Sequence, residues 1–207
     1  MSFGLSFTDL LTIFGAIIVS MAFHEAMHGF VAHWLGDTTA RDEGRLTLNP
    51  AKHIDLVTTI LLPLVLILFH VPPFFVAKPV PFNPHRVKFG EYGAALVGIA
   101  GPLTNLLLAV IVAFIMHFSA VGTQIYNIMS IFVYVNLGFF VFNMIPFPPL
   151  DGSRLLYAFA PDPLRKLMAQ IESGGFMVIV LFMLLLFPFI GPVIQSIVEN
   201  IYTFLLQ

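Results

Sequence analysis

Two histidines and a glutamate near the N-terminus have the types and spacing that could bind a metal and hydrolyse a peptide bond. They form a His-Glu-x-x-His pattern at His24, Glu25 and His28. On a helix, the two imidazoles lie one turn apart on the same face and can bind one metal ion with the carboxylate beside them. In such zinc hydrolases the ion activates a bound water and the glutamate accepts its proton. The pattern therefore predicts His24 and His28 as Zn²⁺ ligands and Glu25 as the general base.

The setting of this pattern decides between function and coincidence. A match at three fixed positions arises by chance in roughly one chain of this length in a few hundred. Residues 10–34 otherwise have the composition of a membrane span. Two histidines and a glutamate are costly inside an apolar span unless they bind something. The setting therefore favours a functional site.

The composition indicates a membrane protein. Hydrophobic residues make up 58% of the chain and charged residues 10%, against about a quarter charged in soluble domains. The formal charge of −2 shows no basic excess, which argues against a nucleic-acid partner. The absence of cysteine excludes disulfides and thiolate metal sites. We expect a multi-pass protein of the cell membrane, surrounded by the lipid bilayer.

Charge-free intervals locate the membrane segments, because about 20 apolar residues are needed to cross a bilayer. The apolar intervals cover residues 10–34, 56–69, 92–150 and 176–198. Residues 92–150 are too many for one helix and predict a pair, 92–118 and 124–145. The N-terminal run lacks a basic region and a cleavage site, so we expect a retained helix, with Asp9 as its cap.

Two of these runs are less regular. Residues 56–69 are few and contain Pro63, so this run either spans with help from residues 71–75 or is re-entrant. The last run carries Pro188 and Pro192, which predict one kinked span or a span followed by an interfacial helix. We expect an all-α polytopic protein with about four to six transmembrane or re-entrant helices, in a single domain of residues 1–207.

Short extended elements are predicted between the helices. Residues 44–48 alternate in polarity like a strand. Residues 77–84 contain three prolines, which forbid a helix and allow only an edge strand or an extended loop. Three further prolines follow Asn143 and must unwind the backbone, which at membrane depth survives only where it lines a cavity or is buried in protein.

A catalytic zinc ion usually has three protein ligands, so a third must be found. Downstream glutamates are candidates, and they lie in polar loops at Glu43, Glu91 and Glu172. Asp151 is favoured because it adjoins the proline-unwound segment, and its charge would partly neutralise the ion in an apolar site. The alternative is that Asp151 forms a turn with Gly152 and caps the next helix.

Three motifs, in this order, resemble the site-2 protease family of intramembrane zinc metalloproteases, the peptidase M50 type. They are His24-Glu25-x-x-His28, Ala100-Gly101-Pro102-x-x-Asn105 and Asn143-x-x-Pro146-x-Pro148-x-Leu150-Asp151-Gly152. The resemblance implies Asp151 as the third ligand, Glu25 as the base, and Asn105 and Asn143 near the substrate. Asn105 could equally form an interhelical hydrogen bond.

The same resemblance implies a function. It implies regulated intramembrane proteolysis, in which the partner is a membrane protein and the cut lies in or near its transmembrane helix. Residues 77–84 resemble the Lys-Pro-Val-Pro element of bacterial members, which presents an edge to substrate. No PDZ or CBS sequence accompanies the motifs, so the resemblance implies a minimal catalytic form.

Orientation depends on how many runs cross. If the first four all span, positive-inside counting favours a cytoplasmic N-terminus. The C-terminal ends of the first and fourth helices would then lie on opposite sides, although His28 and Asp151 must meet. Either the histidines lie near mid-depth and residues 143–151 dip towards them, or residues 56–69 do not cross fully.

Two other functions remain open. One is a membrane-bound zinc peptidase whose site opens to the aqueous phase. The other is a metal transporter with His24, His28 and Asp151 along its path. A transporter needs a polar route across the membrane, yet no other formal charge lies within the predicted spans.

Overall fold

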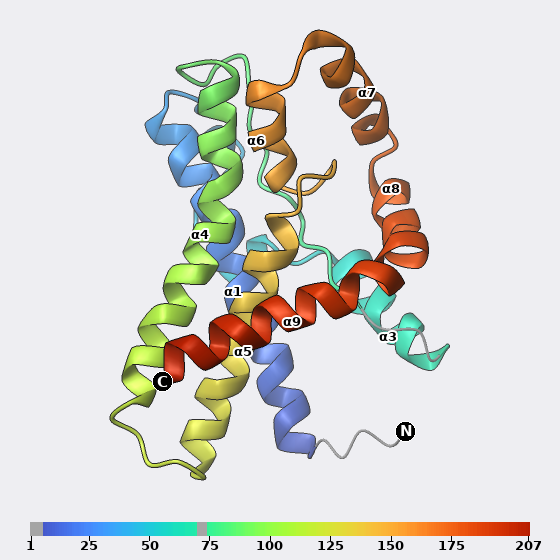
Figure 1. Cartoon of the computed structure of the whole chain (residues 1–207). Coiled ribbons are helices and arrows are strands. Elements are labelled where there is room, and N and C mark those ends of the chain that lie inside the picture. The colour runs from blue at the N-terminus through green and yellow to red at the C-terminus, as the bar shows by residue number, and fades with distance from the viewer. Residues whose placement is uncertain (1–5, 70–73) are drawn as a thin grey trace.

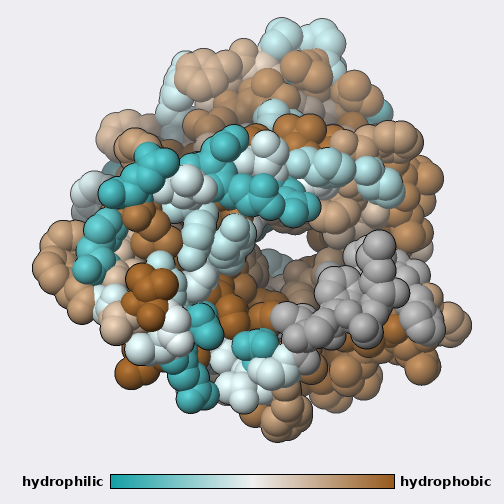
Figure 2. Space-filling view, turned by 60° about the horizontal axis from the view of Figure 1, so that its bottom comes forward, coloured by the Kyte–Doolittle hydropathy of each residue, from teal (hydrophilic) through white to brown (hydrophobic). Residues whose placement is uncertain are grey.

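The computed structural model describes residues 6–69 and 74–207 and is mainly helical, with no β-strand in those residues (Figure 1). Four helical stretches are long and apolar enough to cross a membrane: α1 (Phe7–Trp34), α4 (Glu91–Met116), α5 (Gln124–Asn143) and the run Phe176–Leu206. The prediction of an all-α polytopic membrane protein is confirmed. Hydrophobic side chains cover much of the molecular surface (Figure 2), as expected where the solvent is lipid.

Helices α1, α4 and α5 pack against one another and form the centre of the protein. Small residues permit close packing between α1 and α4, and the buried set includes Ala22, Ala26, Ala94 and Ala95. Helix α1 begins with a capping box between Ser6 and Asp9. The expectation that Asp9 itself is the cap is therefore wrong, because Ser6 caps the helix and Asp9 holds the N3 position.

The chain between α1 and α4 leaves and returns at one end of the bundle. The backbone N–H of Lys88 donates to the carbonyl of Leu35 over 2.9 Å, which joins the end of α1 to the start of α4. The buried carboxylate of Asp37 makes a second connection there, because it accepts a hydrogen bond from the backbone N–H of Asn83. Burial acts to raise the pKa of Asp37, but hydrogen bonds from Thr39 and Asn83 lower it overall and keep the group ionised.

Residues 56–68 form a short helical excursion within this connection. It consists of a π-helical turn, η2 (Leu56–Leu61), and α3 (Leu62–Leu68). These thirteen residues extend roughly 20 Å, less than the ~30 Å of a bilayer core. The backbone N–H of Lys78 donates a hydrogen bond of 2.9 Å to the carbonyl of His53. The chain therefore returns, after the excursion, to the point from which it left. This favours the re-entrant alternative, while residues 70–73 lie outside the described part of the chain.

This arrangement removes the difficulty over the meeting of His28 and Asp151. Three crossings, α1, α4 and α5, separate the N-terminus from Asp151, so the C-terminal ends of α1 and α5 point in the same direction (Figure 1). The orientation that was counted from four crossings therefore does not apply to this arrangement. All nine lysines and arginines of the chain fall in residues 35–90 or 144–175, which begin at the C-terminal ends of α1 and α5.

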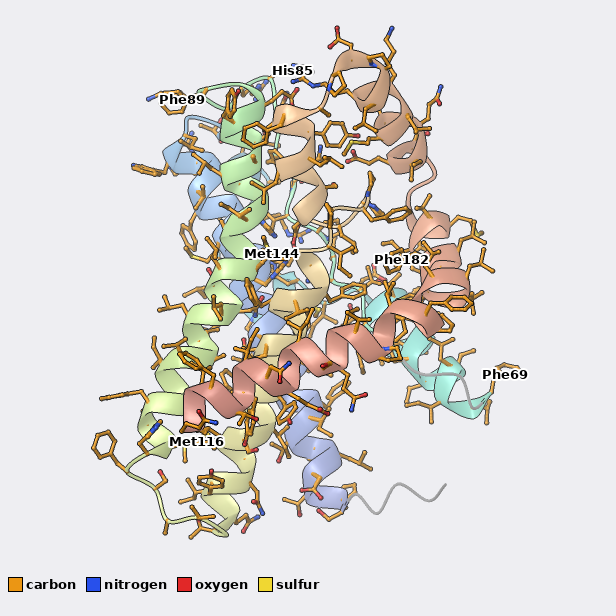
Figure 3. All side chains as sticks on the ribbon, viewed as in Figure 1. Phe69, His85, Phe89, Met116, Met144 and Phe182 are labelled. Atoms are coloured by element: carbon orange, nitrogen blue, oxygen red, sulfur yellow. The ribbon has the colours of Figure 1, made fainter. Side chains whose placement is uncertain are left out.

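Helix α5 stops well inside the bundle. Met144, the residue after it, lies about midway between Phe89 at one end and Met116 at the other (Figure 3). An irregular segment follows, and then α6 (Gly152–Phe159) and α7 (Asp162–Ser173). The polar segment after residue 151 is thus a pair of short helices.

The last apolar run is bent. It comprises α8 (Phe176–Leu181), a π-helical turn η3 (Phe182–Leu186) and α9 (Phe187–Leu206). Helix α9 crosses α5 obliquely (Figure 1). The bend confirms the predicted kink, and it falls at the π-helical turn next to Pro188.

The predicted strand at residues 44–48 does not form. Short helices α2 (Thr39–Asp42) and η1 (Pro50–Lys52) enclose this loop, and the segment has no ladder partner in the described residues. Residues 74–83 are extended, as the prolines predicted, but they too are not part of a sheet. Alternating polarity alone therefore misled the prediction for residues 44–48.

Candidate metal and catalytic site

Helix α1 presents both histidines to the centre of the bundle. His24 and His28 are buried, with 4% and 7% of their surfaces exposed. Their rings pack edge to face with centroids 4.7 Å apart. The helix therefore places two imidazoles on one face, as the spacing predicted.

Asp151 reaches these histidines from the irregular segment after α5. Prolines 146, 148 and 149 prevent a helix there. Gly152 allows the chain to turn tightly, because a Cβ at this position would lie 2.7 Å from the carbonyl oxygen of Ile145. Asp151 precedes α6, but its side chain makes no capping hydrogen bond. The carboxylate instead turns towards α1, which disfavours the capping alternative.

Three side-chain atoms converge at one point. Asp151 Oδ2 lies 2.9 Å from His24 Nε2 and 3.4 Å from His28 Nε2. The two Nε2 atoms are 3.1 Å apart. Among the described residues, this is the one group of three or more His, Cys, Asp or Glu side chains close enough to share a metal ion.

Helix α4 closes the site from the opposite side. A Cβ at Gly101 would lie 2.7 Å from His28 Cε1 and 2.8 Å from His24 Cε1, so both rings occupy the space that glycine leaves. A Cβ at Gly98 would lie 3.0 Å from the carbonyl oxygen of Asp151. These two glycines let α4 approach all three converging residues.

The chemistry of the converging atoms fits a divalent metal. His28 Nδ1 lies 2.7 Å from the carbonyl oxygen of Val97. A carbonyl only accepts, so Nδ1 must donate, and Nε2 of the neutral ring carries a lone pair. Nitrogen and carboxylate lone pairs that face one another at these distances repel unless a cation lies among them. Two imidazoles and one carboxylate form a known zinc ligand set.

Glu25 lies beside this cluster and is half-buried. Its Oε2 accepts a hydrogen bond of 2.8 Å from the backbone N–H of Val80. Val80 belongs to the extended segment of residues 74–83, so this segment contacts the candidate base directly. Sequence reasoning missed this contact because it joins a helix to a loop 55 residues away.

A cavity of about 520 Å³ adjoins the cluster and separates α1 from α8. His24, Glu25 and Asp151 line it, so the candidate chemistry faces open space. Its other walls come from η2, the extended segment, the C-terminal part of α5, the residues just before Asp151, α8 and η3. They are mainly apolar and include Phe75, Phe139, Phe142, Phe176, Ile179 and Met183.

The two asparagines of the motifs lie in different surroundings. Asn143 lines the cavity, and its amide donates to the carbonyl of Phe139 over 3.0 Å. Asn105 is fully buried and its Oδ1 lies 2.6 Å from His24 Nδ1. Asn105 is not among the residues that line the cavity.

The three glutamates considered as ligands lie away from the cluster. Glu172 accepts hydrogen bonds from Arg154 and from the hydroxyl of Tyr157. Burial and then this hydrogen bond raise the pKa of Tyr157 to about 12. Glu91 begins α4, and Glu43 follows α2 at the surface. None of the three belongs to the metal-binding group found in the described residues.

Comparisons with known proteins agree with the resemblance to the site-2 protease family. The family model "Peptidase family M50" matches residues 118–187. The "Putative zinc metalloprotease YwhC" of Bacillus subtilis is 42% identical over 171 residues, which cover 78% of this chain and 75% of that protein.

More distant relatives carry similar names. The "Putative zinc metalloprotease Rip2" of Mycolicibacterium smegmatis is 26% identical over 81% of this chain and 64% of its own length. The "Zinc metalloprotease MJ0392" of Methanocaldococcus jannaschii is 31% identical over 34% of this chain and 21% of its own length. No solved structure matches the chain. The identity to YwhC over most of both proteins shows that the chain belongs to peptidase family M50, the site-2 protease family.

Proposed function

We propose that this peptidase is a zinc metalloprotease that hydrolyses a peptide bond within or beside a transmembrane segment of a membrane-protein substrate. The depth of the site carries the proposal. His24 lies ten residues before Trp34, where α1 ends, which corresponds to about 15 Å along the helix. Gly101 lies ten residues after Glu91, where α4 begins. A site at this depth lies inside a hydrocarbon core of about 30 Å.

His24, His28 and Asp151 would hold the zinc ion. Bound zinc supplies Lewis acidity, which makes a water molecule acidic at neutral pH and polarises a carbonyl group. One carboxylate and two neutral imidazoles leave a net charge of +1, which is less costly in an apolar interior than +2. The protein's own residues supply the remaining functions of the site.

Glu25 would take the proton from the attacking water and later deliver it to the leaving amine. Its position on the cavity wall, next to His24 and Asp151, supports this role. The N–H of Val80 binds Oε2 and fixes the carboxylate. In the described residues no hydrogen bond uses Oε1, which remains available for the proton.

The extended segment would bind the substrate backbone. The N–H groups of Val76, Lys78 and Val80 donate to the carbonyls of Thr58 and His53 and to Glu25, respectively. Backbone groups alternate in direction along an extended chain. Those of Phe75 and Ala77 therefore face the other edge, and no hydrogen bond within the described residues uses them. A substrate could add to this edge as a strand.

Asn143 would contact the same substrate. One amide hydrogen donates to the carbonyl of Phe139, which leaves the other free to donate into the cavity. A donor here could bind the carbonyl oxygen of the scissile bond, where negative charge develops during attack. Asn143 thus keeps the substrate-binding role that the family resemblance implied.

The distribution of charge sets the proposed orientation. All nine lysines and arginines lie on segments that begin at the C-terminal ends of α1 and α5. Positive charge accumulates on the cytoplasmic side of membrane proteins. We therefore place this end in the cytoplasm of a cell-membrane protein and the N-terminus outside, which reverses the orientation expected from four crossings.

Reconstitution into liposomes tests the function. The purified protein with zinc should cleave a co-reconstituted substrate within its transmembrane segment, and Glu25→Gln should not. Mass spectrometry of the products locates the cut. Cleavage confined to soluble chains would favour the aqueous-facing peptidase. Zinc uptake into the liposomes without cleavage would favour the transporter.

A further inference from the structure

Two buried asparagines connect His24 to the backbone of α1 and α5. Asn105 in α4 and Asn136 in α5 are both fully buried within helices of apolar composition. Polar side chains in such surroundings are costly unless every hydrogen-bonding group finds a partner. Their amides form one chain that ends at the ring of His24.

The orientation of the Asn136 amide is fixed by a backbone carbonyl. Asn136 Nδ2 lies 2.9 Å from the carbonyl oxygen of Phe132. A carbonyl only accepts, so the NH₂ group must face Phe132 and the amide oxygen must face Asn105. The reversed amide would place two oxygens together at one end and two NH₂ groups together at the other.

Asn105 is oriented in turn. Its Nδ2 lies 2.9 Å from Asn136 Oδ1 and 3.2 Å from the carbonyl oxygen of Ser20. Both of these atoms accept, so the NH₂ group of Asn105 donates to them. The remaining amide oxygen therefore points at His24 Nδ1, 2.6 Å away.

This chain of donors determines the tautomer of His24. An amide oxygen only accepts, so His24 Nδ1 must carry the proton, and Nε2 of the neutral ring carries a lone pair towards Asp151 and His28. His28 has the same tautomer, because its Nδ1 donates to the backbone carbonyl of Val97. The two ligands thus differ, because only His24 depends on side chains.

We propose that Asn136 is a positioning residue which, through Asn105, holds His24 in the tautomer that binds the metal. The proposal rests on the metal site of the proposed function. It also gives Asn105 a task other than substrate binding, in agreement with its absence from the cavity wall. Partners that orient a ligand histidine in this way typically contribute 10- to 100-fold, roughly, to metal affinity.

Zinc affinity in the purified full-length protein, measured by competition with a chelator in detergent, tests this role. Asn136→Leu removes the acceptor for Asn105 and should weaken zinc binding by about 10-fold or more. Asn136→Asp should stay close to wild type, because a protonated carboxyl group can still accept from Asn105 and donate to Phe132. Rescue by this conservative variant would not be expected of a residue that only fills space.

Leu137→Ala is the matched control. Leu137 is the next residue of α5 and is fully buried in the core cluster of α4, α5 and α9. Its truncation should lower thermal stability and leave zinc affinity unchanged. Equal affinity for wild type and Asn136→Leu would overturn the proposal, as would an equal loss in Leu137→Ala.

Nitrogen NMR of histidine-labelled, zinc-loaded wild type gives a second readout that needs no Asn136 variant to fold. The His24 signals, assigned against His24→Gln, should show a protonated Nδ1 and an unprotonated Nε2. The reverse assignment would overturn the inference while leaving the proposed function intact. Wild type that binds no zinc would overturn both.

Discussion

The bundle of α1, α4 and α5 differs sharply from the flank formed by η2, α3, the extended segment and α8. In the bundle, four polar side chains are buried and hydrogen bonded, namely His24, His28, Asn105 and Asn136. On the flank, large apolar side chains such as Leu56, Leu64 and Met177 are mostly exposed. The cavity lies between these two regions. The comparison suggests that the bundle holds the chemistry rigidly while the flank receives the substrate.

Each region should respond to substitution in its own way. Changes in the bundle should reduce turnover of every substrate, because they act on groups that take part in the reaction or hold them. Changes on the flank should alter which substrates bind and leave the metal in place. The predictions below test this division.

The largest effect is expected for Glu25→Gln. The amide cannot accept the proton from water, and loss of one general base costs on the order of 10² to 10⁴ in rate. The three proposed ligands are unchanged, so zinc stoichiometry should equal that of wild type. Cleavage at the wild-type rate with zinc bound would exclude this role for Glu25.

Gly101→Ala should come next. A methyl group would overlap both imidazole rings, and displacement of catalytic groups by about 1 Å can cost roughly 10²-fold in rate. Zinc affinity and turnover should fall together. Gly138→Ala is the control, since a Cβ at Gly138 would meet no atom within 4 Å. If both variants behave alike, close packing by α4 does not hold the site.

The core of this site was predictable because its signals are local. His24, Glu25 and His28 occupy one helical turn, and the prolines before Asp151 mark an unwound segment in an apolar region. The convergence of Asp151 on the histidines agrees with the ligand set expected from the sequence. The roles themselves stay predictions until zinc binding is measured.

The remaining features depended on contacts between distant segments. The number of crossings could not be counted from hydropathy, because residues 56–68 are apolar yet fold back through the backbone pair of His53 and Lys78. Asn136 was missed, although an asparagine in an apolar helix is itself a signal. Its partner in α4 follows from packing, which no sequence pattern gives. The hydrogen bond between Val80 and Glu25 was missed for the same reason, because it depends on packing between distant segments.

Ala77→Pro tests the flank. Proline removes an N–H that no hydrogen bond in the described residues uses, so the fold should be retained. Loss of one backbone hydrogen bond to substrate, about 0.5–1.5 kcal/mol, corresponds to a decrease of about two- to tenfold in kcat/KM. Ala77→Val keeps the N–H and serves as the control. Unchanged kcat/KM in the proline variant would argue against strand addition at this edge.

The smallest effect concerns the substrate rather than the enzyme. A transmembrane helix satisfies its own backbone hydrogen bonds and shields each carbonyl, so it must unwind before it can reach the cavity and pair with Phe75 and Ala77. Glycine is about 1 kcal/mol less favourable in a helix than good helix formers such as leucine. Replacing one glycine near the scissile bond with leucine should therefore slow cleavage by about fivefold.

The measurement is the cleavage rate in liposomes for a matched pair of substrates, corrected for binding. Equal rates would show that unwinding does not limit the reaction, and would favour a flank that accepts chains already extended in water.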